Sequence, residues 1–323
     1  MNSNQQNTII SSLAQEVQEG LTAFPKYLSS KFFYDKKGDA LFQQIMALPE
    51  YYLTEAEHSI LISHSSHIAN SFSDQDEGFD LIELGAGDGK KTKVLLKELL
   101  STKKNFTYHP IDISKNAVDG LVASLNTEFP ELDVQGQIGE YFEVLDRLQH
   151  LSSRKKVIMV LGSNIGNLKH PRAIDFLKRL RDVMNTNDLL FMGFDQKKNP
   201  QTVLNAYNDT TGITAAFNKN ILTRINKELD SNFDLDTFIH WETYDPESGT
   251  AKSFLVSTKK QTIAINDLDL QIQLEAWETI HTEISQKYDD EIVSWLADEA
   301  GLQISESFTD SQKRYKNYIF NKK

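Results

Sequence analysis

The sequence predicts an α/β protein with a Rossmann-like sheet of seven strands and a second, inserted α+β lobe. Short apolar runs alternate with helical segments from about residue 80 to 197, and this alternation is typical of a doubly wound parallel sheet. The alternation stops over residues 198–285 and returns over 286–323. The sheet is therefore predicted to be interrupted by an insertion, and three glycines after its first strand mark a candidate ligand site.

The first strand and helix of the sheet are predicted within residues 80–100. The apolar run 81–84 indicates a buried strand, which breaks at Gly85, Gly87 and Gly89. Glycine lets the backbone approach a ligand closely, and the free N–H groups at a helix start face that ligand. After Lys91, apolar residues recur at helical spacing, namely Val94, Leu95, Leu99 and Leu100.

The spacing of the glycines separates two classes of cofactor. Dinucleotide-binding folds use G-x-G-x-x-G, whereas this chain has G-x-G-x-G preceded by the acidic Glu83. This pattern is closer to the loop with which S-adenosylmethionine-dependent methyltransferases hold the amino-acid end of their cofactor. A glycine turn without a ligand and a nucleotide-dependent oxidoreductase remain as alternatives.

The remaining strands and helices of the sheet follow in order. We expect a C-cap at Gly301, because glycine is favoured after the last turn of a helix. A terminal helix and hairpin that close a five-stranded parallel sheet match the seven-strand plan of class I methyltransferases. The predicted strands are 106–112, 132–138, 156–161, 188–194, 302–308 and 315–320, and the predicted helices are 114–128, 171–184 and 289–300.

The second lobe is predicted from the N-terminal segment and the insertion. Residues 60–197 and 286–323 would form the methyltransferase domain, and residues 1–59 and 198–285 a substrate-binding lobe over the cofactor site. Thr54–Glu57 has the S/T-x-x-E pattern of a capping box and predicts a helix from there to about residue 72. Other helices are expected over 8–24, 39–47 and 200–228, and strand-like runs over 237–244, 251–258, 261–264 and 271–275.

Composition limits the partners and the compartment. The chain has 323 residues, a net charge of −12 and no cysteine. An acidic protein is a poor partner for nucleic acid or an anionic membrane, and disulfides and thiolate metal sites are excluded. The first 20 residues are polar, and the histidines lack metal spacing such as H-E-x-x-H. We expect a cytoplasmic monomer that acts on a small molecule without a metal.

Polar residues at the predicted strand ends are candidate ligand contacts, because ligands in open α/β sheets bind beyond the carboxyl ends of the strands. Asp112 suits the hydroxyls of a ribose, or it caps the next helix. The pair Glu140–Tyr141 is placed to meet an adenine, or it forms a plain turn. The segment 161–168 carries two glycines and two asparagines, which can orient a ligand but cannot act as a base.

Several strings along the chain make the prediction more specific. The chain resembles the histidine-specific Nα-methyltransferases of ergothioneine biosynthesis, which make hercynine (trimethylhistidine). The resemblance covers about residues 20–320. It is carried, in order, by Phe33–Asp35, Leu48–Glu57, Leu84–Gly87, Gly166–Leu168, Ala206–Asn218 and Thr282–Ser285.

The resemblance implies a role for each matching residue. Asn167 and Tyr207 would hold the substrate carboxylate, while Tyr51 and Tyr34 would lie near the α-amino group as catalytic residues. Glu283 and Ser285 would bind the imidazole. On the S-adenosylmethionine side, the matching residues are Gly85, Gly87, Lys91, Asp112, Glu140 and Tyr141.

Two departures from the family pattern bear on the ligands. Glu140–Tyr141 replaces the usual Asp-Phe but keeps one acid and one aromatic ring. Ser253 stands where the family commonly has Met beside the imidazole, and we expect the smaller side chain to enlarge that pocket. The prediction is Nα-methylation of L-histidine, with another aromatic amino acid such as tryptophan, or a silent S-adenosylmethionine-binding protein, as alternatives.

Overall fold

The computed structural model describes residues 12–73, 78–151 and 154–323. The chain divides into two compact units. Unit 1 comprises the described residues up to Tyr52 together with Asn199–Ser285, and unit 2 comprises Leu53–Lys198 and Gln286–Lys323. Residues 8–11 of the helix expected over 8–24 lie outside the described residues, and the helix begins at Ser12 within them.

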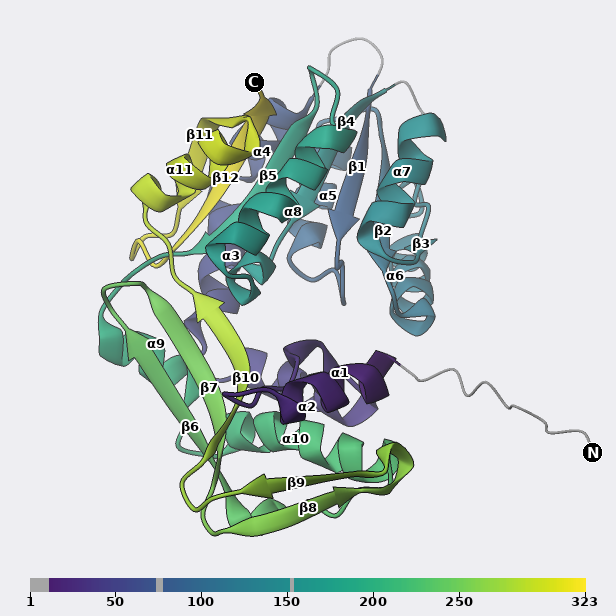
Figure 1. Ribbon diagram of the computed structural model, residues 1–323. Coiled ribbons are helices and arrows are strands. Elements are labelled where there is room, and N and C mark those ends of the chain that lie inside the picture. The colour runs from purple at the N-terminus through teal and green to yellow at the C-terminus, as the bar shows by residue number, and fades with distance from the viewer. Residues whose placement is uncertain (1–11, 74–77, 152–153) are drawn as a thin grey trace, which may run out of the picture. The chain divides into compact units, whose positions relative to one another are not determined.

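Unit 2 is built on a seven-stranded sheet with the order β11-β12-β5-β4-β1-β2-β3 (Figure 1). Strand β1 is parallel to both β2 and β4, and β12 is antiparallel to β5. The predicted class I methyltransferase fold is thereby confirmed. The strands are β1 (Phe79–Leu84), β2 (Phe106–Asp112), β3 (Gln137–Ile138), β4 (Lys155–Val160), β5 (Leu189–Asp195), β11 (Leu302–Thr309) and β12 (Tyr315–Lys322).

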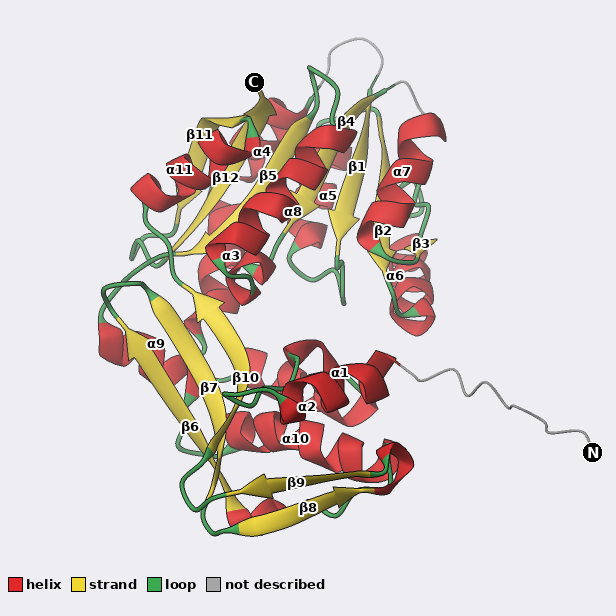
Figure 2. Ribbon diagram, viewed as in Figure 1, coloured by secondary structure: helices red, strands yellow, loops and turns green. Residues whose placement is uncertain are grey.

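Helices cover both faces of this sheet (Figure 2). All six residues of β1 are buried, and alternate side chains point to opposite faces, so Leu81 and Ile82 belong to different hydrophobic clusters. One cluster contains α3 (Tyr52–Ser63), α4 (Ser65–Phe72), α5 (Thr92–Ser101) and α6 (Lys115–Glu128). The other contains α7 (Tyr141–Leu151), α8 (His170–Val183) and α11 (Asp290–Ala300).

Unit 1 has its own hydrophobic core, formed by helices and two small antiparallel sheets. One sheet has the order β10-β7-β6 and the other pairs β8 with β9. The helices are α1 (Ser12–Thr22), α2 (Lys36–Met46), α9 (Pro200–Tyr207) and α10 (Ile213–Glu228). The strands are β6 (Phe238–Asp245), β7 (Thr250–Ser257), β8 (Gln261–Ile265), β9 (Leu270–Leu274) and β10 (Thr279–Gln286).

Some local predictions were wrong. The capping box at Thr54–Glu57 does not exist, because α3 already begins at Tyr52 and the Glu57 carboxylate is buried against distant residues. The single helix expected up to residue 72 is two helices that meet at His64. The third strand is only two residues long, with an isolated bridge at Val134, and the helix expected over 200–228 is interrupted between α9 and α10.

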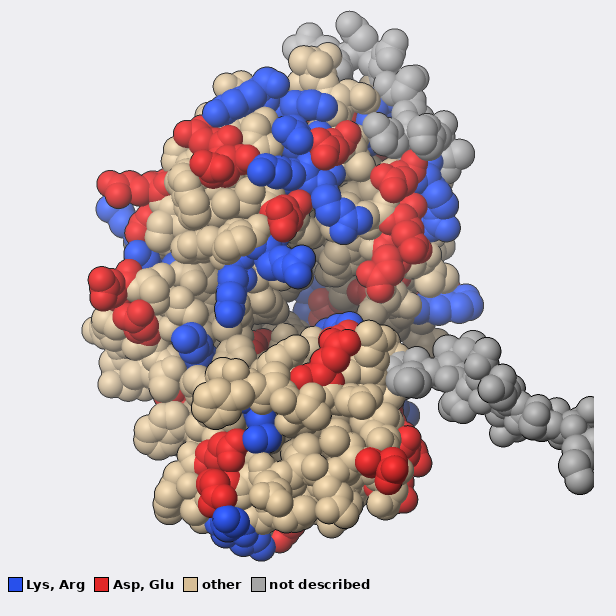
Figure 3. All heavy atoms as spheres, in the orientation of Figure 1, with Lys and Arg blue, Asp and Glu red and all other residues tan. Residues whose placement is uncertain are grey.

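Charged side chains of both signs are interspersed on the face shown in Figure 3. Exposed ion pairs, such as Lys115 with Asp119, contribute little to stability individually. Among the described residues, none of the helices has the length and apolarity needed to span a membrane.

Candidate active site

The glycine loop follows β1, and its three glycines differ in whether neighbouring atoms leave room for a side chain. Gly85, Gly87 and Gly89 have φ values of +72°, +56° and +66°, a region that residues with a Cβ rarely adopt. A Cβ on Gly85 would lie 2.7 Å from the Tyr141 hydroxyl, and one on Gly89 would lie 2.5 Å from Leu121 Cδ1. A Cβ on Gly87 would meet nothing within 4 Å. Gly87 therefore borders open space where a ligand can approach the backbone.

Lys91 is the residue immediately before α5, which begins at Thr92. Its ammonium group donates to the Glu57 carboxylate at 2.5 Å, and a Cβ on Gly162 would lie 3.5 Å from the same nitrogen. Gly162 follows β4, the strand beside β1 in the sheet. A cation thus lies where the glycine loop adjoins the end of the neighbouring strand.

Asp112 ends β2 and is half-buried. Its Oδ1 accepts from the backbone N–H of Ser114. Ser114 itself is the N-cap of α6, because its Oγ accepts from the Ala117 N–H, so the alternative that Asp112 caps this helix was wrong. Tyr141 opens α7, and burial raises the pKa of its hydroxyl to about 12, with the charges of Asp112 and Glu140 adding to the rise. The Tyr141 phenol is therefore neutral near pH 7, while Glu140 is exposed.

Glu83 lies under the glycine loop and is buried. It accepts hydrogen bonds from the hydroxyls of Thr92, at 2.7 Å, and Tyr108. Burial raises the pKa of Glu83 to about 7 despite these two bonds, which favour the carboxylate. The fold therefore favours the protonated carboxyl more than the unfolded chain does.

The stability of unit 2 is expected to depend on pH through Glu83. Because the folded-state pKa lies near 7 and the ordinary value is 4.5, the stabilisation is complete below about pH 4.5 and is lost as the pH rises through 7. The excess unfolding free energy of the wild type over Glu83→Gln should fall by roughly 3 kcal/mol across that range. Urea denaturation at a series of pH values measures it, and a constant difference would contradict the assignment.

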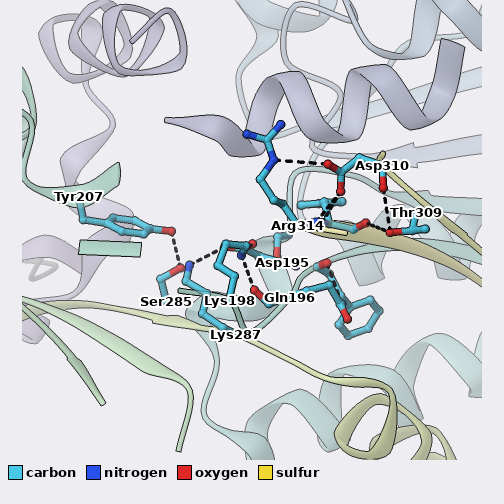
Figure 4. A network of polar contacts seen from close by, with 12 residues as sticks. Asp195, Gln196, Lys198, Tyr207, Ser285, Lys287, Thr309, Asp310 and Arg314 are labelled. Carbon is cyan, nitrogen blue, oxygen red and sulfur yellow. Dashed lines mark hydrogen bonds and ion pairs between the residues drawn. The ribbon is translucent and has the colours of Figure 1, made fainter. Parts of the chain in front are cut away.

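Four aromatic rings contact one another in succession in unit 1, three from residues 34–51 and the fourth, Tyr207, from the end of α9. The ring centroids of Tyr34 and Phe42 are 5.6 Å apart, those of Phe42 and Tyr51 6.3 Å, and those of Tyr51 and Tyr207 6.2 Å. The Tyr207 hydroxyl lies 2.7 Å from Ser285 Oγ (Figure 4). The structure thus brings together three tyrosines and the serine that the sequence analysis singled out.

Glu283 and Ser285 lie on β10. Because side chains two residues apart in a strand point the same way, one carboxylate and one hydroxyl are presented on the same side. Burial raises the pKa of the Tyr34 hydroxyl well above its ordinary value, and the negative charge of Glu283 adds to the rise. The hydroxyl is therefore neutral near pH 7, and the residue as a whole is 41% exposed.

Ser253 is buried on β7 and faces Glu242 on the neighbouring strand β6. Its hydroxyl donates to Glu242 Oε2 at 2.7 Å, and its backbone oxygen accepts from Thr282 Oγ1 at 3.0 Å. Ser253 is therefore one strand away from the residue that precedes Glu283. The position carries a buried hydroxyl–carboxylate pair, and the sequence analysis did not anticipate Glu242.

His240 supports the backbone of Tyr207 and was not singled out from the sequence. Its Nδ1 accepts from the Asn218 side-chain amide, which also donates to the Phe254 carbonyl, so its Nε2 carries the hydrogen and donates to the Tyr207 carbonyl at 2.8 Å. Burial lowers the pKa of His240. The neutral tautomer is thus fixed by hydrogen bonds on both ring nitrogens.

Asn167 ends a short 3₁₀ helix, Asn164–Asn167, that follows β4, and its side chain is exposed. The preceding Ser163 accepts from the Asp195 backbone N–H at 3.0 Å, and the Ile165 carbonyl accepts from the Tyr288 hydroxyl at 3.1 Å. These bonds fix the segment that carries Asn167 against Tyr288 and the end of β5.

An ion network at the end of β5 anchors the two chain segments that lead to and from residues 199–285 (Figure 4). Buried Asp195 contacts Lys198 Nζ at 2.5 Å and Lys287 Nζ at 2.8 Å. Burial alone would raise the pKa of Asp195, but the two ammonium groups outweigh it and lower the value. Burial lowers the pKa of Lys198 to about 8. Ser285 thus lies two residues before Lys287, which is held by its ion pair with Asp195.

The sequence matches a family described as histidine-specific, S-adenosylmethionine-dependent methyltransferases over residues 13–322. The chain belongs to this family. It is 36% identical over 300 residues to the histidine N-alpha-methyltransferase of Mycolicibacterium smegmatis, covering 92% of this chain and 91% of the relative. The enzyme of the same name from Mycobacterium tuberculosis is 33% identical over 298 residues, with the same two coverages.

Similarity extends to relatives with other names. An N-methyltransferase of Aspergillus fumigatus, fsqC, is 27% identical over 321 residues, covering 96% of this chain and 84% of the relative. The predicted class of enzyme, an S-adenosylmethionine-dependent methyltransferase, is confirmed by the family.

The residues of unit 2 fit the cofactor of this methyltransferase. The space over Gly87 admits its backbone approach, the Lys91 ammonium suits its carboxylate, and Asp112 and Tyr141 suit its nucleoside. When bound, S-adenosylmethionine supplies a methyl group already activated on a sulfonium. The described residues contain no cluster of three or more His, Asp or Glu side chains that could hold a metal ion.

Proposed function

We propose that the protein transfers methyl groups to the α-amino nitrogen of L-histidine, up to the trimethylated product hercynine. The observation that carries this proposal is strand β10, which presents Glu283 and Ser285 on one side while Tyr207 reaches the Ser285 hydroxyl. An imidazole has two nitrogens. A carboxylate can accept a hydrogen bond from the N–H, and a hydroxyl can donate one to the other nitrogen. We assign this activity to a cytoplasmic monomer acting on the free amino acid.

The protein's part in the reaction is to bind, orient and exclude water. An ammonium has no lone pair, so the amine must lose a proton before each transfer, and orientation can then remove several kcal/mol from the barrier. The raised pKa of Tyr34 keeps its hydroxyl protonated. We therefore assign Tyr34 to orienting the amine, and Tyr51 with a water to passing the proton to solvent.

The tyrosine rings also suit the product. Each methyl transfer enlarges the amine, and the third makes it a fixed cation. Aromatic faces attract such cations by about 0.5–2 kcal/mol each. The row formed by Tyr34, Phe42, Tyr51 and Tyr207 supports a pocket that accepts the amine as it grows.

Asn167 and Tyr207 are proposed to hold the substrate carboxylate. Asn167→Ala and Tyr207→Phe should each weaken histidine binding by roughly 10- to 100-fold, because a hydrogen bond to a charged group contributes about 1.5–3 kcal/mol. Cofactor affinity should stay within twofold of wild type. Calorimetry with S-adenosylhomocysteine present measures both. Histamine, which lacks the carboxylate, should bind poorly, and binding equal to that of histidine would contradict the assignment.

A second candidate substrate is another aromatic amino acid such as tryptophan. The observation that favours testing this class is Ser253, which stands where the family commonly has Met. It forms a buried polar pair with Glu242 next to the strand that carries Glu283. A calorimetric screen of the twenty amino acids with S-adenosylhomocysteine separates the candidates. Histidine should bind at least tenfold more tightly than tryptophan, and the reverse order would replace histidine as the proposed substrate.

A further inference from the structure

Glu57 is a buried carboxylate to which no role has yet been given. Its side chain has 0% exposure, yet it accepts four hydrogen bonds. Oε2 accepts from Lys91 Nζ at 2.5 Å and from the Gly162 backbone N–H at 2.8 Å. Oε1 accepts from the Tyr315 hydroxyl at 3.1 Å and from Asn317 Nδ2 at 2.9 Å.

The space for this carboxylate is made by the sheet itself. A Cβ on Gly193 of β5 would lie 2.3 Å from Glu57 Oε1 and 2.4 Å from the Tyr315 hydroxyl. Asn317 is directly opposite Gly193 in the β5–β12 pair. Glu57 of α3 therefore lies over Gly193 of the interior strand β5, with Oε1 bound to residues of β12 and Oε2 bound to Lys91 and Gly162.

The two oxygens have different partners. Oε1 meets two neutral donors, which hold the carboxylate in place. Oε2 meets the one cation of the set, Lys91, and the backbone at the end of β4. The Lys91 side chain is 24% exposed, and its ammonium has three hydrogens. A carboxylate held by β12 through Oε1 thus orients a cation that lies near Gly162 and is still partly exposed to solvent.

We propose that Glu57 is a positioning residue that holds the Lys91 ammonium toward the amino-acid end of the cofactor. Without this carboxylate, the flexible four-carbon stem of lysine would leave the ammonium without a defined place. Glu57 Oε2 also accepts from the Gly162 N–H, so the backbone that follows β4 is held next to the Lys91 ammonium. The proposal rests on the cofactor contact assigned to Lys91 and does not depend on which amino acid is methylated.

The test compares two ligands of the methyl-donor site. S-Adenosylhomocysteine carries the amino-acid end, whereas 5′-methylthioadenosine has the same nucleoside and thioether but lacks it. Glu57→Gln and Lys91→Met should each raise the dissociation constant for S-adenosylhomocysteine roughly tenfold or more and leave that for 5′-methylthioadenosine within twofold. In steady state, the KM for S-adenosylmethionine should rise while the KM for the amino acid does not.

The double variant shows whether Glu57 acts through Lys91. If it does, adding Glu57→Gln to Lys91→Met should change S-adenosylhomocysteine affinity less than twofold, because the pair is already broken. Tyr315→Phe removes a neutral donor and keeps the charge, so it should change this affinity less than threefold.

A matched control lies in the same sheet. Lys156 and Asp188 form another buried lysine–carboxylate pair at 2.8 Å, at the start rather than the end of β4. Asp188→Asn should lower stability without changing either affinity. The proposal is overturned if Glu57→Gln weakens both ligands alike, if it leaves S-adenosylhomocysteine binding unchanged, or if its effect adds fully to that of Lys91→Met.

Discussion

Glu283→Ala is expected to reduce kcat/KM for histidine by at least two orders of magnitude. The imidazole would lose the carboxylate that accepts from its N–H, and a ring that needs no such partner would be rejected less strongly. Sites built to hydrogen-bond a substrate can discriminate by 10⁴-fold or more, because a buried polar group is left unpaired when the wrong ring binds. Relative activity on tryptophan or phenylalanine should therefore rise in this variant.

Competition between histidine and tryptophan with S-adenosylmethionine, followed by mass spectrometry, measures this change in specificity. Glu278→Ala is the matched control, since Glu278 lies just before β10 but pairs with Lys26 at 2.6 Å near the surface. That variant should retain the histidine preference. Unchanged histidine activity in Glu283→Ala would show that Glu283 is only a solvated strand residue.

Gly87→Val is expected to abolish detectable S-adenosylmethionine binding while the protein remains folded. The valine side chain would enter the space that borders Gly87, where nothing lies within 4 Å, and the positive φ of +56° adds strain of roughly 1–2 kcal/mol. A decrease of roughly 1–2 kcal/mol in the free energy of unfolding leaves most domains folded. Calorimetry measures the binding, and circular dichroism with thermal unfolding checks the fold.

Gly120→Val provides the control for added volume. A Cβ on Gly120 of α6 also meets nothing within 4 Å, but this glycine is helical and far in sequence from the loop. The variant should bind the cofactor with wild-type affinity. If a folded Gly87→Val protein did the same, the cofactor could not lie over the glycine loop.

Local sequence signals predicted most of unit 2. Asp289 accepts from the Ile292 N–H at the start of α11, and Gly301 ends the helix with a φ of +72°, as the expected N-terminal start and C-cap require. The buried strands β1, β4 and β5, of which β4 is partly exposed only at Lys155, were visible as short apolar runs. These features depend on neighbours within a few residues, so the sequence contains them directly.

Features that depend on distant partners could not be predicted in this way. Glu57 matched the spacing of a capping box, but two of its partners, Tyr315 and Asn317, are 258 and 260 residues away. The mixed pattern of residues 141–151 concealed α7, and β10 was missed because its polar residues Glu283 and Ser285 interrupt the apolar pattern.

The substrate side of the site illustrates the same limit. Tyr34, Tyr51 and Tyr207 were named from a resemblance, whereas Phe42, whose ring lies between those of Tyr34 and Tyr51, was not. Only its position in an aromatic-rich segment could have indicated it. Glu242 was missed because its link to Ser253 is a cross-strand pair, which no local pattern specifies.

Product analysis tests the central claim most directly. Purified wild-type protein is incubated with S-adenosylmethionine and equal concentrations of histidine and tryptophan, and the products are resolved by mass spectrometry with fragmentation. We predict histidine carrying three methyl groups on its α-nitrogen, with mono- and dimethylhistidine as earlier species. Faster methylation of tryptophan, or methylation of the imidazole ring instead of the α-nitrogen, would contradict the proposed function.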